Sequence, residues 1–201
     1  LLRLFRDLDR TIDRIRDIGD SELTTLRLEL PDELLRWWLA SRLADFSALY
    51  PHVRLQFSTV ALYPNSTEKA DICNRLQHEN VDIAVHYGKL RDKSVRQQPL
   101  YQPTIVPVAR QLPATESGGR WLVDSQHLVW QQFSRQFPRL SQQLDSQQAA
   151  QTAALDLLTN SSTVALTDQL FLSHPQLKGL QTMADKAFKL PEAVYISYKE
   201  R

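Results

Sequence analysis

The stretch from Thr25 to Gly88 decides the fold, and it opens with a strand followed by a helix. Residues 24–30 (TTLRLEL) alternate apolar and polar side chains, which is the period of a β-strand with one buried face. Beyond Pro31 the apolar residues recur at helical spacing, and we expect Asp32 to cap the helix that they form. The pair Tyr50-Pro51 should end this helix, because a proline disfavours helical backbone in the residue before it.

Two more strands are predicted in the same stretch, at residues 53–57 (VRLQF) and 81–85 (VDIAV), with a helix over residues 68–78 between them. The order strand, helix, strand, helix, strand predicts a parallel sheet with right-handed crossovers. In open sheets of this kind, ligands bind beyond the carboxyl ends of the strands, where helix N-termini also point. Those ends lie at Pro31 to Glu33, Thr59 to Ser66 and His86 to Gly88.

The composition is that of an ordinary globular protein. Of the 201 residues, 42% are apolar and 23% are charged, which suits one large domain or two small ones. The 24 basic and 23 acidic residues give a net charge of +1, without the basic excess typical of nucleic-acid or membrane-surface binding. No apolar run approaches the roughly 20 residues of a membrane helix. Because the chain begins without Met and without a signal-peptide core, we expect a fragment of a longer protein.

Residues 1–18 carry the strongest helix pattern in the chain, with apolar residues three and four positions apart. One interpretation is an amphipathic helix packed on its own domain. The other is a dimerisation helix, because positions seven apart form the seam of a short coiled coil that Gly19 ends. The seam residues are Leu1, Leu4, Leu8, Ile12, Ile15 and Ile18.

The second half of the chain repeats the α/β pattern after a short strand at residues 104–109, which is preceded by Pro103. Prolines around this extended segment suit a crossing between two lobes. We expect strands at 121–124, 141–145 and 163–166, helices at 128–137 and 147–158, and extended segments at 177–183 and 193–198.

These residues carry a family resemblance. The long helix that closes in Phe46 and Tyr50-Pro51, followed about 30 residues later by Asp82-Ile83-Ala84, resembles the effector-binding region of LysR-type transcriptional regulators. The resemblance implies an α/β fold with two Rossmann-like lobes joined by crossing strands, the type 2 periplasmic-binding-protein fold. It also implies a small-molecule effector bound between the lobes and an N-terminal linker helix that dimerises the protein.

The implied organisation is a linker and dimerisation helix over residues 1–20, lobe I over residues 22–101 with 193–201, and lobe II over residues 102–192. The winged helix-turn-helix domain of the family is absent from this chain, so DNA would be bound only through that missing domain. The resemblance further implies a cytoplasmic homodimer or homotetramer.

Candidate effector contacts lie at the predicted strand ends, and each has a simpler structural alternative. The simpler role for Asp32 is to cap its helix without touching a ligand. The simpler placement for His86 is an exposed loop. Two carboxylates at a helix start oppose an anionic ligand, so we predict a neutral or cationic effector. The candidates are Asp32, Glu33, Tyr63, His86 and Tyr87 in the first lobe and Ser125, Gln126, Gln147 and Gln148 in the second.

Enzymatic function finds no support in the sequence. The five histidines have no partner at metal-ligand spacing, and there is no glycine-rich phosphate loop or nucleophile elbow, so we expect no metal, cofactor or catalytic residue. Cys73 is the only cysteine, which excludes an intrachain disulfide and favours a reducing compartment. We interpret it as a structural residue, with a redox sensor as the alternative. The alternative function is that of a solute-binding protein of a transport system.

Overall fold

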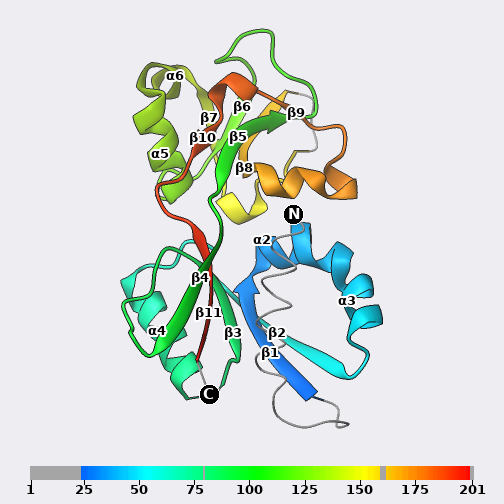
Figure 1. Cartoon of the computed structure of the whole chain (residues 1–201). Coiled ribbons are helices and arrows are strands. Elements are labelled where there is room, and N and C mark those ends of the chain that lie inside the picture. The colour runs from blue at the N-terminus through cyan, green and yellow to red at the C-terminus, as the bar shows by residue number, and fades with distance from the viewer. Residues whose placement is uncertain (1–23, 79, 159–161, 200–201) are drawn as a thin grey trace. The chain divides into compact units, whose positions relative to one another are not determined.

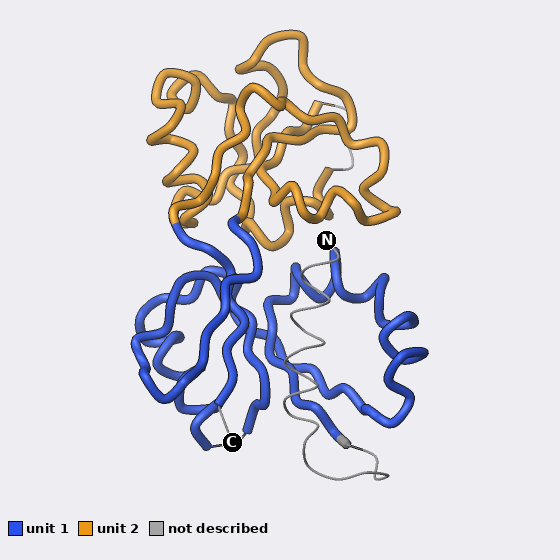
Figure 2. The backbone as a smooth tube through the Cα atoms, viewed as in Figure 1, with its two compact units in different colours: residues 1–102, 192–201 blue, residues 103–191 orange. Residues whose placement is uncertain are grey.

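The computed structural model describes residues 24–78, 80–158 and 162–199, so the predicted helix over residues 1–18 lies outside the described part. The chain divides into two compact units, coloured separately in Figure 2. Unit 1 comprises the chain up to Gln102 and again from Glu192, and unit 2 comprises Pro103–Pro191. Each boundary differs by one residue from the expected one.

Unit 1 is built on a five-stranded sheet with the order β2-β1-β3-β11-β4 (Figure 1). The parallel order predicted for the first three strands is confirmed, since β1 pairs in parallel with both β2 and β3. The late strand β11 inserts between β3 and β4 and is antiparallel to both. The strands are β1 (Thr24–Pro31), β2 (Val53–Val60), β3 (Ile83–Tyr87), β4 (Val95–Tyr101) and β11 (Val194–Lys199).

Helical backbone follows β1 without interruption, but its start differs from the prediction. The strand continues to Pro31, so Asp32 is already the first helical residue, and no side chain caps this end. Asp32 instead pairs with Arg36 one turn later, at 2.9 Å. The segments are α2 (Asp32–Leu34), a π turn η1 (Leu35–Leu39), a 3-10 turn η2 (Ala40–Arg42) and α3 (Leu43–Leu49).

The second helix of unit 1, α4 (Ser66–Gln77), begins with a capping box. The Asn65 side chain accepts the backbone N–H of Glu68, and the Glu68 carboxylate accepts that of Asn65. These two bonds satisfy amide groups that a helix start leaves open, and they explain why α4 begins two residues before the predicted position.

Buried ion pairs connect the elements of unit 1. Glu29 is 3% exposed and pairs with Arg75 of α4 at 2.7 Å. Arg27 forms a two-pronged pair with Asp82, with N–O distances of 3.1 and 3.0 Å, and its backbone N–H also donates to Asp82. The alternation of β1 therefore places two charged side chains on one face and its leucines on the other.

Unit 2 has a sheet with the order β10-β5-β8-β6-β7, and β9 pairs with the end of β5 at Val108 and Ala109, beyond the part that β10 pairs with. β6 is parallel to both β7 and β8, whereas β5 is antiparallel to β8. The strands are β5 (Thr104–Ala109), β6 (Arg120–Val123), β7 (Asp145–Gln148), β8 (Thr163–Asp168), β9 (Gln181–Thr182) and β10 (Phe188–Lys189). The helical segments are α5 (Leu128–Gln136), α6 (Pro138–Gln143), η3 (Gln151–Ala153), η4 (Gln169–Ser173), η5 (Pro175–Leu177) and η6 (Ala184–Lys186).

The prediction for residues 138–158 is wrong in detail. Pro138 opens α6 rather than only ending α5, because proline is well suited to the first position of a helix. The predicted strand at 141–145 is therefore largely helix, and the predicted helix over 147–158 begins instead as β7. Pairing of β7 with β6 outweighs the helix propensity of its Gln residues. The segment 177–183 likewise keeps only the short strand β9.

An aromatic cluster forms the core of unit 2 around Phe133, which is fully buried. Its ring centroid lies 5.6 Å from that of Trp121, 5.3 Å from Trp130, 5.2 Å from Phe137 and 6.2 Å from Phe188. α5 is thus fixed to the sheet by tilted and edge-to-face rings at distances typical of favourable aromatic pairs.

Candidate functional site

The carboxyl ends of β1, β2 and β3 lie at one edge of the unit 1 sheet, because the three strands are parallel. Glu33 follows β1 there and is half-buried. Burial raises the pKa of Glu33, a backbone hydrogen bond opposes the rise, and the neighbouring Asp32 charge adds to it. A carboxyl group in this setting gains from a ligand that donates a hydrogen bond or carries positive charge. Asp32 is exposed and already paired with Arg36.

His86 lies in the interior, contrary to the predicted position at an open strand end. β3 continues through Tyr87, and His86 is 0% exposed within it. Its Nδ1 lies 2.9 Å from the Gly88 carbonyl, which can only accept, so Nδ1 carries the proton. Nε2 then accepts from the Ser197 hydroxyl at 2.7 Å. Burial lowers the pKa of His86 to about 4, and both ring nitrogens are engaged within unit 1.

Tyr87 closes the same corner of the sheet. Its side chain is 5% exposed, and its hydroxyl accepts the backbone N–H of Glu192 at 3.0 Å. Tyr63, half-buried in the loop after β2, meets Tyr87 edge to face with centroids 5.0 Å apart. The Gly88 N–H donates to the Ala193 carbonyl at 2.9 Å. The structure therefore brings the two predicted tyrosines together, and Tyr87 anchors the segment where the chain re-enters unit 1.

The matching edge of unit 2 lies at the carboxyl ends of β6 and β7. Ser125 and Gln126 are exposed in the turn between β6 and α5, as predicted from their position. His127 caps α5 by accepting the Val129 N–H, and burial lowers the pKa of His127 although the Asp124 charge opposes this. This edge of unit 2 thus presents Ser125 and Gln126 in a turn that the His127 cap of α5 holds in place.

Gln147 and Gln148 lie exposed within β7, not at the start of a helix. A different glutamine occupies the end of this strand. Gln151 opens η3, its backbone N–H donates to Asp124 at 3.1 Å, and its Nε2 donates to the Leu166 carbonyl at 2.7 Å. Its Oε1 is buried and accepts no hydrogen bond from any described residue. Sequence reasoning missed Gln151 because it placed a helix where β7 lies.

Neither a metal cluster nor a membrane helix is found in the described ranges. No group of three or more His, Cys, Asp or Glu side chains among these residues could hold a metal ion. None of the helices described is both long and apolar enough to cross a membrane.

Two α/β units, each with parallel strands ending at a polar edge, define a class of ligand-sensing domains. The family model of the LysR substrate binding domain matches residues 19–198 of the chain. The chain therefore belongs to the LysR substrate-binding domain family, and effector sensing in a LysR-type regulator is its function class, whereas a transport role is not favoured. No curated protein matches the chain.

Solved structures of regulators share the fold at low sequence identity. The effector domain of the regulator AmpR of Pseudomonas aeruginosa has a TM-score of 0.60 at 14% identity, over 88% of this chain and 86% of that one. The regulatory domain of MexT, a transcriptional activator in Pseudomonas aeruginosa, has a TM-score of 0.61 at 13% identity, over 90% of each chain. VV2_1132, a LysR family transcriptional regulator, has a TM-score of 0.66 at 11% identity, over 98% of this chain and 69% of that one.

Proposed function

We propose that the chain senses a neutral or cationic small molecule that donates hydrogen bonds. In unit 1 the proposed acceptor is the Glu33 carboxylate. In unit 2 the proposed contacts are Ser125, Gln126 and Gln151. Tyr63 and Tyr87 pack against each other and support the unit 1 edge. Asp32, Gln147 and Gln148, also predicted as effector contacts, are secondary contacts in this proposal.

The observation that carries the proposal is the unsatisfied Oε1 of Gln151. A buried carbonyl oxygen without a donor costs free energy, typically about 1–3 kcal/mol. The Gln151 side-chain amide cannot rotate to find another donor, because its Nε2 donates to the Leu166 carbonyl. The Gln151 backbone is also fixed, since its N–H donates to Asp124. A ligand hydroxyl, ammonium or amide N–H would recover the missing bond, whereas a carboxylate would not.

Glu33 supports the same ligand class from the other unit. Its pKa is raised mainly by burial, so a cation or a hydroxyl donor near the carboxylate would stabilise the charged form. An anionic effector would meet this carboxylate and that of Asp32 at one helix start.

Effector binding would act by population shift. A ligand that binds one conformation of the regulator better favours that conformation by its differential affinity, and an attached DNA-binding domain would respond. We propose that this coupling operates in a cytoplasmic homodimer or homotetramer formed through residues 1–18, with DNA contacted only by that attached domain. The chain itself then catalyses no reaction.

A thermal-shift screen of the 201-residue chain tests the ligand class. Suitable probes are arginine and spermidine as cations, glucose as a neutral polyol and succinate as an anion. We expect a cationic or neutral probe to raise the melting temperature, and Gln151→Leu to abolish that rise, while Gln136→Leu, an exposed change at the end of α5, retains it. A rise that only succinate produces and that Gln151→Leu removes would contradict the proposed class.

Sedimentation tests the oligomer. The double change Leu8→Glu with Ile15→Glu places charges on the predicted seam, and we expect the sedimenting mass to fall to that of one chain. Arg6→Gln, away from the seam, should leave it unchanged. An equal mass for all three proteins would remove the dimerisation role of residues 1–18.

A further inference from the structure

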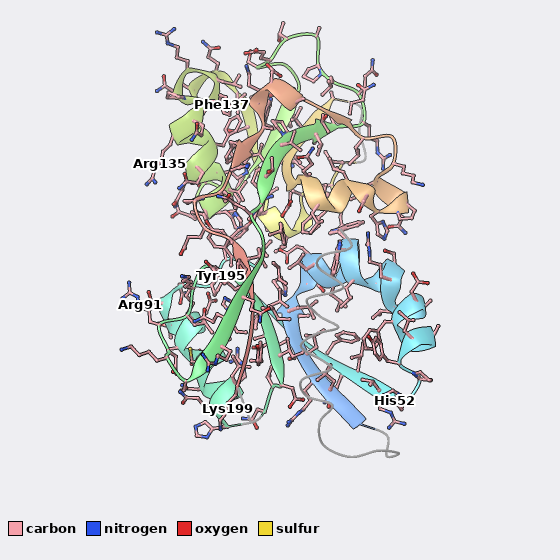
Figure 3. All side chains as sticks on the ribbon, viewed as in Figure 1. His52, Arg91, Arg135, Phe137, Tyr195 and Lys199 are labelled. Carbon is pink, nitrogen blue, oxygen red and sulfur yellow. The ribbon has the colours of Figure 1, made fainter. Side chains whose placement is uncertain are left out.

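A second pocket lies wholly within unit 1, between α4 and the loop that connects β3 to β4. Its volume is about 450 Å³, within the range of small-molecule sites. The α4 side supplies Ser66, Lys69, Cys73 and Asn74, and the loop supplies Lys89, Arg91 and Asp92. Arg91 is seen beside α4 in Figure 3.

The lining carries more positive than negative charge. Lys69, Lys89 and Arg91 face the carboxylate of Asp92, and the Glu192 carboxylate lies close to the Lys69 ammonium beside Gly88. Among the described residues neither Lys89 nor Arg91 forms an ion pair, and both are exposed. These two loop cations repel one another, and a bound anion would relieve that repulsion.

The Asp92 carboxylate keeps its negative charge, because hydrogen bonds from Ser94 lower the pKa of Asp92. It accepts the Ser94 N–H at 2.8 Å and the Ser94 hydroxyl at 2.7 Å, and it also accepts Nε2 of Gln77. These bonds fix the loop beside α4, so Lys89 and Arg91 extend from an ordered turn.

The Lys69 ammonium lies beside Gly88. Gly88 is buried with φ of 75°, and a Cβ built there would lie 2.6 Å from Lys69 Nζ and 2.7 Å from Glu192 Oε2. The missing side chain of Gly88 therefore leaves the room in which these two charged groups lie.

Ser66, the first residue of the 12-residue helix α4, also lines the pocket. The helix start itself is already occupied, because the Glu68 carboxylate accepts the Asn65 N–H in the capping box. The proposed site therefore depends on Lys69 of α4 and the two loop cations, which line one pocket from two segments.

We propose that this pocket binds a compact small-molecule anion with at least two negative charges, borne by phosphate or carboxylate groups. The pocket lies within unit 1 on the α4 side of its strand ends, and it shares no lining residue with the effector contacts proposed above. Its ligand class is opposite in charge to the proposed effector, so the regulator would read two signals through two sites.

Calorimetric titration of the 201-residue chain tests the site, with pyrophosphate, citrate and sulfate as probes at constant ionic strength. We expect saturable binding with a dissociation constant on the order of 1 mM or tighter. Stronger binding of pyrophosphate than citrate would identify phosphate as the preferred group, and the reverse order would identify carboxylates. Absence of saturable binding by all three probes would overturn the proposal.

Surface variants with matched charge provide the control. Lys89→Gln and Arg91→Gln should each weaken binding about tenfold, because each removes a charge-assisted contact. Lys93→Gln removes the same charge from the same loop outside the pocket lining, and we expect a change of less than about twofold. An equal loss in all three variants would show a general charge effect and would overturn the site.

Cys73 offers an independent readout because it lines the pocket and is the only thiol of the chain. The thiol is partly accessible, and burial raises its pKa, so alkylation by neutral iodoacetamide is measured at mildly alkaline pH. Pyrophosphate bound in the pocket should cover the thiol and slow this alkylation in proportion to the fraction bound. Protection should disappear in Arg91→Gln and persist in Lys93→Gln. Calorimetric binding without any protection of Cys73 would place the anion elsewhere and refute this pocket.

Discussion

The two units hold a helix against their sheets by different interactions. Both cover parallel strands with helices, but unit 1 fastens α4 to its sheet by the buried pair Glu29–Arg75, and unit 2 fastens α5 by the rings around Phe133. Ion pairs respond to pH and to the loss of one partner, while ring stacking responds mainly to lost volume. The difference teaches that the two halves of this sensor can be perturbed separately.

The largest effect is expected in the aromatic core of unit 2. Phe133→Ala removes a fully buried ring that four other rings contact, and it should lower the free energy of unfolding by about 3–5 kcal/mol. Urea unfolding followed by tryptophan fluorescence measures the change. Phe133→Leu, which keeps most of the volume, should cost clearly less, and an equal cost for Ala and Leu would mean that specific ring contacts, not the filled volume, hold α5.

The next effect concerns the buried pair of unit 1. Glu29→Ala leaves Arg75 without its partner, which should cost about 2–4 kcal/mol in urea unfolding. The double variant Glu29→Leu with Arg75→Leu should regain much of that loss, because no unpaired charge remains. If the double variant were as unstable as the sum of the single changes, packing rather than charge would fasten α4.

A pH effect should distinguish unit 1 through His86. Its pKa in the folded protein is about 4 against 6.5 for the free side chain, so the unfolded chain takes up the proton first as the pH falls. The stabilisation is complete above about pH 6.5 and is lost between 6.5 and 4, with a total of about 3 kcal/mol. Unfolding of His86→Gln should depend less steeply on pH over this window, and an unchanged slope would refute the neutral, buried state of His86.

The smallest effects are expected at exposed ion pairs. Asp32–Arg36 in unit 1 and Arg120–Asp145 in unit 2 have side chains that are about half exposed or more. Asp32→Asn and Arg120→Gln should each change the free energy of unfolding by less than about 0.5 kcal/mol. A loss above about 1 kcal/mol in either variant would show that exposure does not govern the contribution of charges here.

The sequence predicted β1, β2 and β11 and placed β3 two residues early, but it did not predict β4 as a strand. The alternation of residues 24–30 puts the leucines of β1 on one face, and the small and branched residues at 83–85 match the fully buried strand β3. The family resemblance supplied the two-unit fold, which the comparisons confirm. What could not be read was the pairing of polar edge segments such as β7, whose strand state depends on β6 rather than on its own side chains.

The site was predictable only in outline. Ser125 and Gln126 could be placed because they follow a recognisable strand, whereas Gln151 could not, since its role depends on the end of β7. His86 was predicted to follow the third strand, but it lies within β3. The sequence does not reveal that Ser197, 111 residues later, would hydrogen-bond its buried ring. Burial created by distant segments is a tertiary property, and local patterns do not contain it.

The position of β11 has a consequence for synthesis on the ribosome. Unit 2 is one continuous segment, so it can complete its sheet as soon as residue 191 has emerged. Unit 1 cannot, because the strand between β3 and β4 is made last, so His86 lacks Ser197 and Tyr87 lacks Glu192 until the last segment arrives. The nascent chain should therefore hold an open three-stranded sheet beside a finished unit 2, and the edge of β3 in that interval is a natural target for chaperones.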